Sequence, residues 1–259
     1  MLLLRIDEPA RGAADDVSVT VDPGTDDRGI LGVWRTVFAA PTMRWLVVSG
    51  IGLQVAAYSL TTFLVPLLQR YYGLSLTVAG LHAGVVLGLA SLLGLVVGGV
   101  ISDRLSRRSA GHRVFLGGFT LLLAAPIAWL AFRIGPDHLT LFVATISLVS
   151  FLQFFFHTSA LPAIADVNPP HLRSQATAMF FAGCYLFGGA LGPIATGMIS
   201  DALAVAGHGV SAEAYGLNQA LLIMMPIALL LAGVGLVGAA AHRQPGPRPA
   251  GPRHRSVRA

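Results

Sequence analysis

Residues 93–108 read LGLVVGGVISDRLSRR, and this stretch decides how the rest of the chain is interpreted. Up to Ser102 the stretch carries no charge. Four charged residues then follow close together: Asp103, Arg104, Arg107 and Arg108. Such an edge is typical of an apolar helix that leaves the hydrocarbon of a membrane, and clustered arginines mark the cytoplasmic side. We therefore expect a transmembrane helix that ends on the cytoplasmic side near Asp103.

The same pattern returns 98 residues further along the chain, where residues 191–201 read LGPIATGMISD. The pattern L-G-x(4)-G-x-I-S-D thus occurs twice. Ala202, rather than an arginine, follows the second copy, which predicts that this copy ends on the opposite side of the membrane. Two copies that cross in opposite directions indicate an inverted repeat, the internal symmetry of many secondary transporters. The alternative is a chance similarity between two glycine-rich helices.

The composition is that of a multispan membrane protein. Charged residues make up 11% of the chain and hydrophobic residues 54%, whereas soluble domains carry about a quarter charged residues. Six uncharged apolar runs approach or exceed the roughly 20 residues that a helix needs to cross a bilayer. These runs are 45–68, 78–102, 114–132, 139–165, 176–200 and 214–241. The predicted fold class is an all-α membrane protein with six transmembrane helices arranged as a 3+3 inverted repeat.

The arginines predict the orientation of these spans. Arg70 and Arg133 fall on one side, and the other fifteen of the 17 arginines fall on the opposite side. The positive-inside rule assigns the arginine-rich side, and both termini with it, to the cytoplasm. Three regions follow from this topology: a cytoplasmic loop or linker over 1–40 with an interfacial helix over 30–40, a six-span region over 41–242, and a disordered basic tail over 243–259. The expected location is the bacterial inner (plasma) membrane.

Other classes of function fit the sequence less well. The formal net charge of +5 is compatible with nucleic acid, but the arginines lie between apolar spans rather than on one face of a soluble domain. No Walker A sequence is present, so direct use of ATP is not expected. An intramembrane hydrolase would use Ser159 and His157, which lie about 200° apart on one helix and belong to no G-x-S-x-G elbow. The single Cys184 excludes an internal disulfide. We expect no enzyme, no metal and no cofactor.

Four segments resemble motifs of the major facilitator superfamily. Residues 99–108, GVISDRLSRR, resemble its loop motif G-x-x-x-D-R-x-G-R-R, with Ser106 in place of the second glycine. Residues 169–178 are similar to the loop pattern P-x-x-x-R-x-x-A, and residues 188–193 to the glycine–proline helix motif. Residues 8–12, EPARG, resemble a sequence that follows the sixth span in spinster-like members.

The resemblance implies the C-terminal six-helix half of a twelve-span transporter. Such a protein moves a small organic or amphipathic, lipid-like solute across the bilayer by alternating access. The implied partner is a missing N-terminal half or a second copy of the chain. The alternative is a truncated membrane module that does not transport, or a half-transporter that needs a partner half.

The resemblance also implies where the solute binds, because the first and fourth spans of this half line the cavity in the family. Polar groups at membrane depth are functional candidates, since burying them in lipid is costly. The candidate cavity residues are Gln54, Tyr58, Gln153, His157 and Tyr185. His157 is a candidate for proton coupling or substrate contact. A neutral histidine that donates to a neighbouring helix is an equally good interpretation.

Three further groups of residues are candidates for conformational roles. The loop motif is implied to contact the other half, with Asp103 in a latch: Gly99, Asp103, Arg104, Arg107 and Arg108. Asp166 and Arg173 flank the loop after the fourth span and are a candidate gate pair. Close helix packing and hinge bending are expected at Gly188, Gly192, Pro193 and Gly197.

Overall fold

A computed structural model describes residues 30–107, 110–204 and 211–242. All regular elements within these residues are helical. Six helical spans are long and apolar enough to cross a membrane: Pro41–Arg70, Leu76–Ser106, Gly111–Ala131, Pro136–Val167, Arg173–Ala202 and Ala212–Ala241. The predicted all-α class and the six predicted spans are confirmed. The EPARG motif at 8–12, Arg108 and the predicted basic tail over 243–259 lie outside the described residues.

The helices α2 (Pro41–Arg70), α5 (Ala110–Ala131) and α10 (Ala212–Ala241) form the first, third and sixth spans. The second span consists of α3 (Leu76–Ala83), the π-helical segment η3 (Gly84–Ala90) and α4 (Ser91–Ser106). The fourth consists of the 3₁₀ turn η4 (Pro136–His138), α6 (Leu139–Gln153) and α7 (Phe155–Val167). The fifth consists of the 3₁₀ turn η5 (Pro170–Leu172), α8 (Arg173–Gly183), the π-helical segment η6 (Cys184–Ala190) and α9 (Leu191–Ala202).

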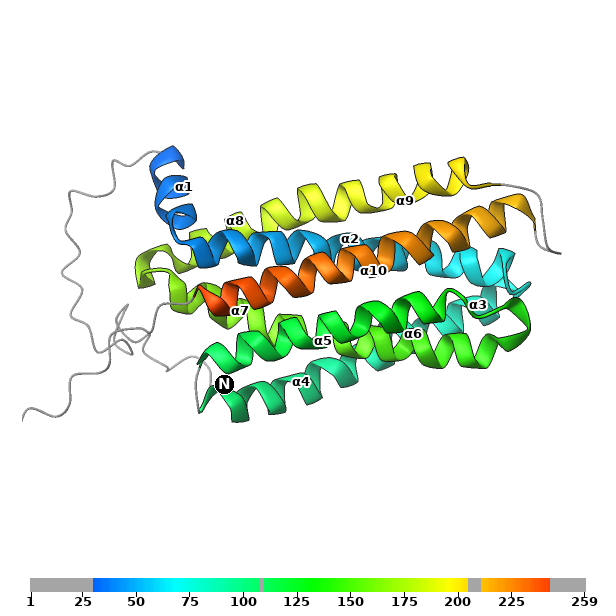
Figure 1. The fold of residues 1–259 in the computed structure, drawn as a ribbon, viewed down its shortest axis with the longest axis horizontal. Coiled ribbons are helices and arrows are strands. Elements are labelled where there is room, and N and C mark those ends of the chain that lie inside the picture. The colour runs from blue at the N-terminus through cyan, green and yellow to red at the C-terminus, as the bar shows by residue number, and fades with distance from the viewer. Residues whose placement is uncertain (1–29, 108–109, 205–210, 243–259) are drawn as a thin grey trace, which may run out of the picture.

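The spans lie side by side along the long axis of the molecule, as Figure 1 shows. The second span, through α3 and α4, follows one edge of the bundle, and the fifth span, through α8 and α9, follows the other edge in the opposite direction. The second span packs against α6 of the second triplet, and the fifth packs against α2 of the first triplet. The predicted 3+3 inverted repeat is therefore confirmed, and each triplet contributes its middle helix to the other.

One glycine occupies the same position in both copies of the repeat and explains this exchange. A Cβ atom on Gly94 would overlap the carbonyl oxygen of Phe151 in α6. A Cβ atom on Gly192 would come within 2.9 Å of Val55 Cα in α2. Each glycine thus allows its helix to approach the backbone of the first helix in the other triplet, as small residues do in membrane bundles.

The helices α2, α5 and α10 form the interior of the bundle, and α10 packs extensively against both of the others. The second and fifth spans are the least buried of the six. Their exposed side chains are large and apolar, among them Leu92, Val96 and Val100 on α4 and Ile194 and Met198 on α9. A surface of this composition suits contact with lipid or with another membrane helix.

The short helix α1 (Ile30–Ala39) lies across one end of the bundle (Figure 1). Val37 is buried, whereas Trp34 and Arg35 are exposed, and Trp34 stacks on Phe38 with ring centroids 4.9 Å apart. This geometry suits the interfacial helix expected over 30–40, whose place in the headgroup layer stays a prediction.

The loop after α2 contacts the loop between the third and fourth spans and the helix α6. The Tyr72 hydroxyl donates a hydrogen bond of 3.3 Å to the Ile134 carbonyl, and its ring lies 4.9 Å from that of Phe142. Burial in this contact raises the pKa of the Tyr72 phenol. The first and second triplets are thereby joined at this end of the bundle.

Candidate functional site

The fourth span is interrupted at Phe154, between the candidate cavity residues Gln153 and His157. The helix α6 ends at Gln153 and α7 begins at Phe155. The Phe154 amide donates to the Ser150 carbonyl, and the His157 amide donates to the Phe154 carbonyl, three residues back. A tighter turn of this kind inside a span is typical of functional hinges. Interrupted helices also build the substrate sites of many transporters.

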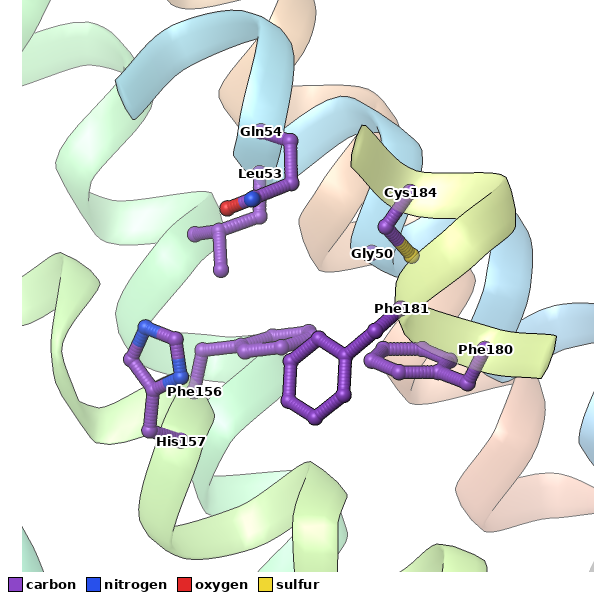
Figure 2. A pocket seen from close by; sticks show the side chains of 8 residues that line it. All are labelled: Gly50, Leu53, Gln54, Phe156, His157, Phe180, Phe181 and Cys184. Atoms are coloured by element: carbon purple, nitrogen blue, oxygen red, sulfur yellow. The ribbon is translucent and has the colours of Figure 1, made fainter. Parts of the chain in front are cut away.

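A pocket lies directly beside this interruption, between α2, α7, α8 and η6, and is drawn in Figure 2. About 190 Å³ of empty space lies between its lining residues, and part of that space is open to the surroundings. Its lining residues come from three spans: Gly50, Leu53, Gln54, Phe156, His157, Phe180, Phe181 and Cys184. The structure therefore brings together two of the predicted cavity residues, Gln54 and His157, which are 103 positions apart in the sequence.

The two polar side chains of the pocket have no hydrogen-bond partner among the described residues. Gln54 is 9% exposed, and neither its carboxamide nor the His157 imidazole is hydrogen-bonded there. Figure 2 shows both side chains pointing into the same space, Gln54 from α2 and His157 from α7. Neither side chain is among those with a fully buried, unpaired polar atom, so their polar atoms are open to the pocket. The pocket thus holds polar groups that remain available to a ligand.

Aromatic rings form the opposite wall of the pocket. Phe180 and Phe181 lie with centroids 5.5 Å apart, and Phe156 packs edge-on against the His157 ring at 5.6 Å. Phe181 extends into the middle of the pocket in Figure 2. No lining residue carries a carboxylate, an ammonium or a guanidinium group.

The remaining predicted cavity residues lie outside this lining. Phe181 stacks on Tyr185 at 5.8 Å, and Tyr185 meets Tyr58 edge-on at 6.0 Å. Both tyrosines are exposed and extend the aromatic wall toward the surface. Gln153 is 5% exposed and, like Gln54, makes no hydrogen bond within the described part of the chain, but it does not line the pocket.

Sequence reasoning missed the contribution of the fifth span to the pocket. Phe180, Phe181 and Cys184 lie within five residues, at spacings that place Phe180 or Phe181 and Cys184 on one helix face. Gly50 leaves room for them, because a Cβ atom there would lie 2.7 Å from Phe180 Cζ and would overlap Cys184 Sγ. The paired phenylalanines were a usable signal, but only packing reveals that they face Gln54.

The loop-motif residues lie at the end of α4. Asp103, Arg104 and Arg107 are exposed, and a Cβ atom on Gly99 would be 4.0 Å from the nearest atom, Thr158 Cγ2. The Ser106 hydroxyl donates to the Asp103 carbonyl at 2.8 Å, at the position where the family motif has glycine. These exposed groups are available to a neighbouring protein surface.

Ser102 has a role that the sequence did not predict. Its hydroxyl donates a hydrogen bond of 3.1 Å to the carbonyl of Thr158 in α7. Pro162, four residues further on, has no N–H to give to that carbonyl. A serine of the repeat motif therefore satisfies a backbone acceptor that a proline leaves free, one residue from His157.

The candidate gate pair has additional partners. Asp166 accepts a 3.0 Å hydrogen bond from Arg113, whose side chain is 12% exposed. Arg173 Nε donates to the carbonyl of Ala165 at 3.0 Å. In the sequence Arg113 is only one of the fifteen arginines on the predicted cytoplasmic side, and the structure adds its link from α5 to α7. The pairing of Asp166 with Arg173 stays a prediction.

The candidate hinge residues differ in how closely they are packed. A Cβ atom on Gly188 would lie 2.6 Å from Gln54 Cβ, so this glycine supports the pocket from behind. A Cβ atom on Gly197 would be 3.8 Å from Phe63 Cζ, an ordinary contact distance. Pro193 lies in the first turn of α9, directly after η6. Among the described residues no group of three or more His, Cys, Asp or Glu side chains is placed to hold a metal.

Two inverted triplets of membrane helices, with a pocket beside an interrupted span, place the chain in the class of membrane proteins built from inverted repeats. The model of the Major Facilitator Superfamily matches the chain twice, over residues 1–193 and 47–259. The chain belongs to the major facilitator superfamily.

Two relatives of known description are similar to this chain. An "MFS-type efflux pump" of Mycolicibacterium smegmatis is 33% identical over 213 residues, which are 80% of this chain and 45% of the relative. A "Citrate-proton symporter" of Salmonella typhi is 27% identical over 178 residues, which are 64% of this chain and 38% of the relative. The chain thus spans less than half the length of the relatives that it matches.

Solved structures of a bacterial homologue of the human lysosomal transporter Spinster are also similar. The inward-facing, unoccupied form matches with a TM-score of 0.69 and 22% sequence identity. This match covers 85% of this chain and 52% of the solved chain. The inward-facing, occupied form matches with a TM-score of 0.59 and 25% sequence identity. This match covers 80% of this chain and 49% of the solved chain. The fold is thus that of half a spinster-like transporter, in agreement with the predicted resemblance.

Proposed function

We propose that this chain is half of a secondary active transporter that moves a small organic or amphipathic solute by alternating access. The solute binds in the pocket between α2, α7, α8 and η6. The observation that carries this proposal is Gln54, nine-tenths buried and without a hydrogen-bond partner, pointing with His157 into one space. Polar groups left unpaired at membrane depth are costly, and a bound solute would offset that cost.

A second six-span unit would complete the site. The described residues enclose the pocket only in part, whereas binding sites bury most of the surface of a drug-sized ligand. The exposed apolar surface of the second and fifth spans and the exposed loop motif with Asp103 are available for such a unit. The partner is an N-terminal half or a second copy of this chain.

The named activities of the two relatives support transport in different ways. An efflux pump and a proton symporter are both membrane transporters, and transport rather than catalysis is the function we propose here. Citrate itself is not carried over to this chain, because the pocket has no cationic side chain to hold a tricarboxylate. His157 is the group in the pocket that is able to take part in proton coupling.

The membrane and the orientation are part of the same proposal. The arginine distribution supports a bacterial plasma membrane protein with both termini in the cytoplasm. In this orientation α1 lies on the cytoplasmic face.

Efflux of a fluorescent amphiphile tests the proposal. Cells that express the full chain are loaded with Nile red, energised with glucose and followed by the loss of fluorescence. We expect faster loss than in empty-vector cells, and a return to the empty-vector rate with Gln54→Leu. Ser150→Ala is the control, because it removes a polar group that is unpaired inside the bundle but lies outside the pocket lining.

Two outcomes would overturn parts of the proposal. Equal rates with the chain and with the empty vector, alone and after co-expression with the N-terminal half of the M. smegmatis pump, would favour the alternative of a non-transporting module. If His157→Ala transports with the pH dependence of the wild-type chain, His157 has no part in proton coupling.

A further inference from the structure

The polar groups of the pocket restrict the chemistry of the solute. Gln54 offers a carbonyl acceptor and two N–H donors, and a neutral imidazole at His157 offers one donor and one acceptor. The donors and acceptors are therefore mixed, and they lie beside the rings of Phe156, Phe180 and Phe181. A ligand that pairs all of them must itself both donate and accept.

While His157 is neutral, a charged ligand leaves some of these donors or acceptors unpaired. A carboxylate accepts hydrogen bonds but donates none, so it would leave the Gln54 carbonyl unpaired, and no guanidinium or ammonium group lines the pocket to balance its charge. A cation with only N–H donors could pair with the acceptors, but it would leave the N–H donors of Gln54 and His157 unpaired and would find no carboxylate in the lining. Desolvating either ion in this apolar surrounding is costly.

We infer that the pocket selects an uncharged, planar group that both donates and accepts hydrogen bonds, such as a carboxamide or a lactam, attached to an aromatic or alkyl body. The inference rests on the proposed function and adds the chemical class of the solute. The amide-like group pairs with Gln54 and His157, and the apolar body lies against Phe181, which extends into the middle of the pocket (Figure 2).

The single cysteine of the chain makes this class measurable. Cys184 lines the pocket from η6 and is the one cysteine in the sequence. A molecule in the pocket will therefore slow the alkylation of Cys184 by N-ethylmaleimide in membranes that contain the full chain. Three probes of the same shape separate the alternatives: benzamide is neutral, benzoate is an anion and benzamidinium is a cation.

We expect benzamide to protect Cys184 at a concentration about tenfold lower than benzoate or benzamidinium, the effect of one hydrogen bond of ordinary net strength. Gln54→Leu should remove the advantage of benzamide. Gln54→Glu should reverse the order in favour of benzamidinium, because it places a carboxylate at the same position. Phe181→Cys in a Cys184→Ser chain supplies a second reporter at a residue that is only half-buried.

The outcomes distinguish the inference from the function on which it rests. If benzoate or benzamidinium protects the wild-type chain as well as benzamide does, the pocket binds ligands but the neutral class is wrong. If none of the three probes protects either reporter, the pocket is not the binding site and both proposals fail. Protection of Ser106→Cys, far from the pocket at the end of α4, would reveal a non-specific effect of the probe and would count against the inference.

Discussion

At the scale of single residues, one hydrogen bond links the repeat motif to the interrupted span. Ser102 donates to the Thr158 carbonyl that Pro162 leaves without its helical donor. We predict that Ser102→Ala lowers the stability of the chain by about 1 kcal/mol, since the carbonyl then lies unpaired inside the bundle. The corresponding fall in the unfolding temperature is about 2–4 °C. Thermal unfolding in detergent, followed by circular dichroism, measures this change.

Pro162→Ala supplies the control for this prediction. Alanine at this position restores an N–H that can donate to Thr158 within α7. Ser102→Ala should therefore cost almost nothing in the Pro162→Ala background. An equal loss in both backgrounds would mean that the serine stabilises the bundle by another route and that the proline plays no part.

The candidate site could be predicted from the sequence only in part, and the reason is visible at the same scale. Gln54 and His157 stand out because polar groups in apolar runs are rare and costly. Phe180, Phe181 and Cys184 do not stand out, because apolar residues are expected on every face of a span, whether that face meets lipid or another helix. Tyr58 and Gln153 satisfied the same rule as Gln54, yet only the packing of α2 against η6 decides which polar residues line the pocket.

At the scale of helices, the two glycines of each repeat motif differ in how closely they pack against neighbouring helices. A Cβ atom on Gly94 would overlap the backbone of α6, whereas one on Gly99 would meet nothing closer than 4.0 Å. We predict that Gly94→Ala destabilises the chain by about 1–3 kcal/mol, because α4 and α6 must separate to admit a methyl group. Gly99→Ala is the matched control in the same motif and should stay close to the wild-type stability. Thermal unfolding in detergent measures both.

The second copy of the motif provides an independent check of this prediction. Gly192→Ala meets Val55 Cα at 2.9 Å, whereas Gly197→Ala meets only Phe63 Cζ at 3.8 Å. The same order of stabilities is expected for this pair. If Gly94→Ala and Gly192→Ala are both tolerated, close backbone contact is not what holds the middle helix of each triplet to the other triplet.

The helices themselves could be predicted from apolar runs, because each span must satisfy its own backbone in lipid. Two features of the spans could not. The π-helical segments η3 and η6 both come shortly before the repeated motif, at Gly84–Ala90 and Cys184–Ala190. A π-helical turn adds one residue to an α-helix, and an apolar run stays apolar when one residue is added. Hydropathy therefore does not reveal π-helical segments. The interruption at Phe154 has no glycine or proline beside it and depends on packing between spans.

At the scale of the whole molecule, the inverted repeat makes a prediction about the two faces of the membrane. The end of α4 and the start of α10 lie at opposite ends of the bundle in Figure 1. The positive-inside rule assigns the first of these ends to the cytoplasm. We therefore expect Ser106→Cys to react with a membrane-impermeant maleimide only in inside-out vesicles, and Ser211→Cys to react only in intact spheroplasts. Both cysteines are introduced into a Cys184→Ser chain, which by itself should remain unlabelled on either side.

If both positions are labelled from the same face, the chain does not cross the bilayer as two inverted triplets. If each is labelled only from the face opposite to the one expected, the inverted repeat stands but the assignment of the termini to the cytoplasm is wrong, and α1 with the loop motif then faces outward.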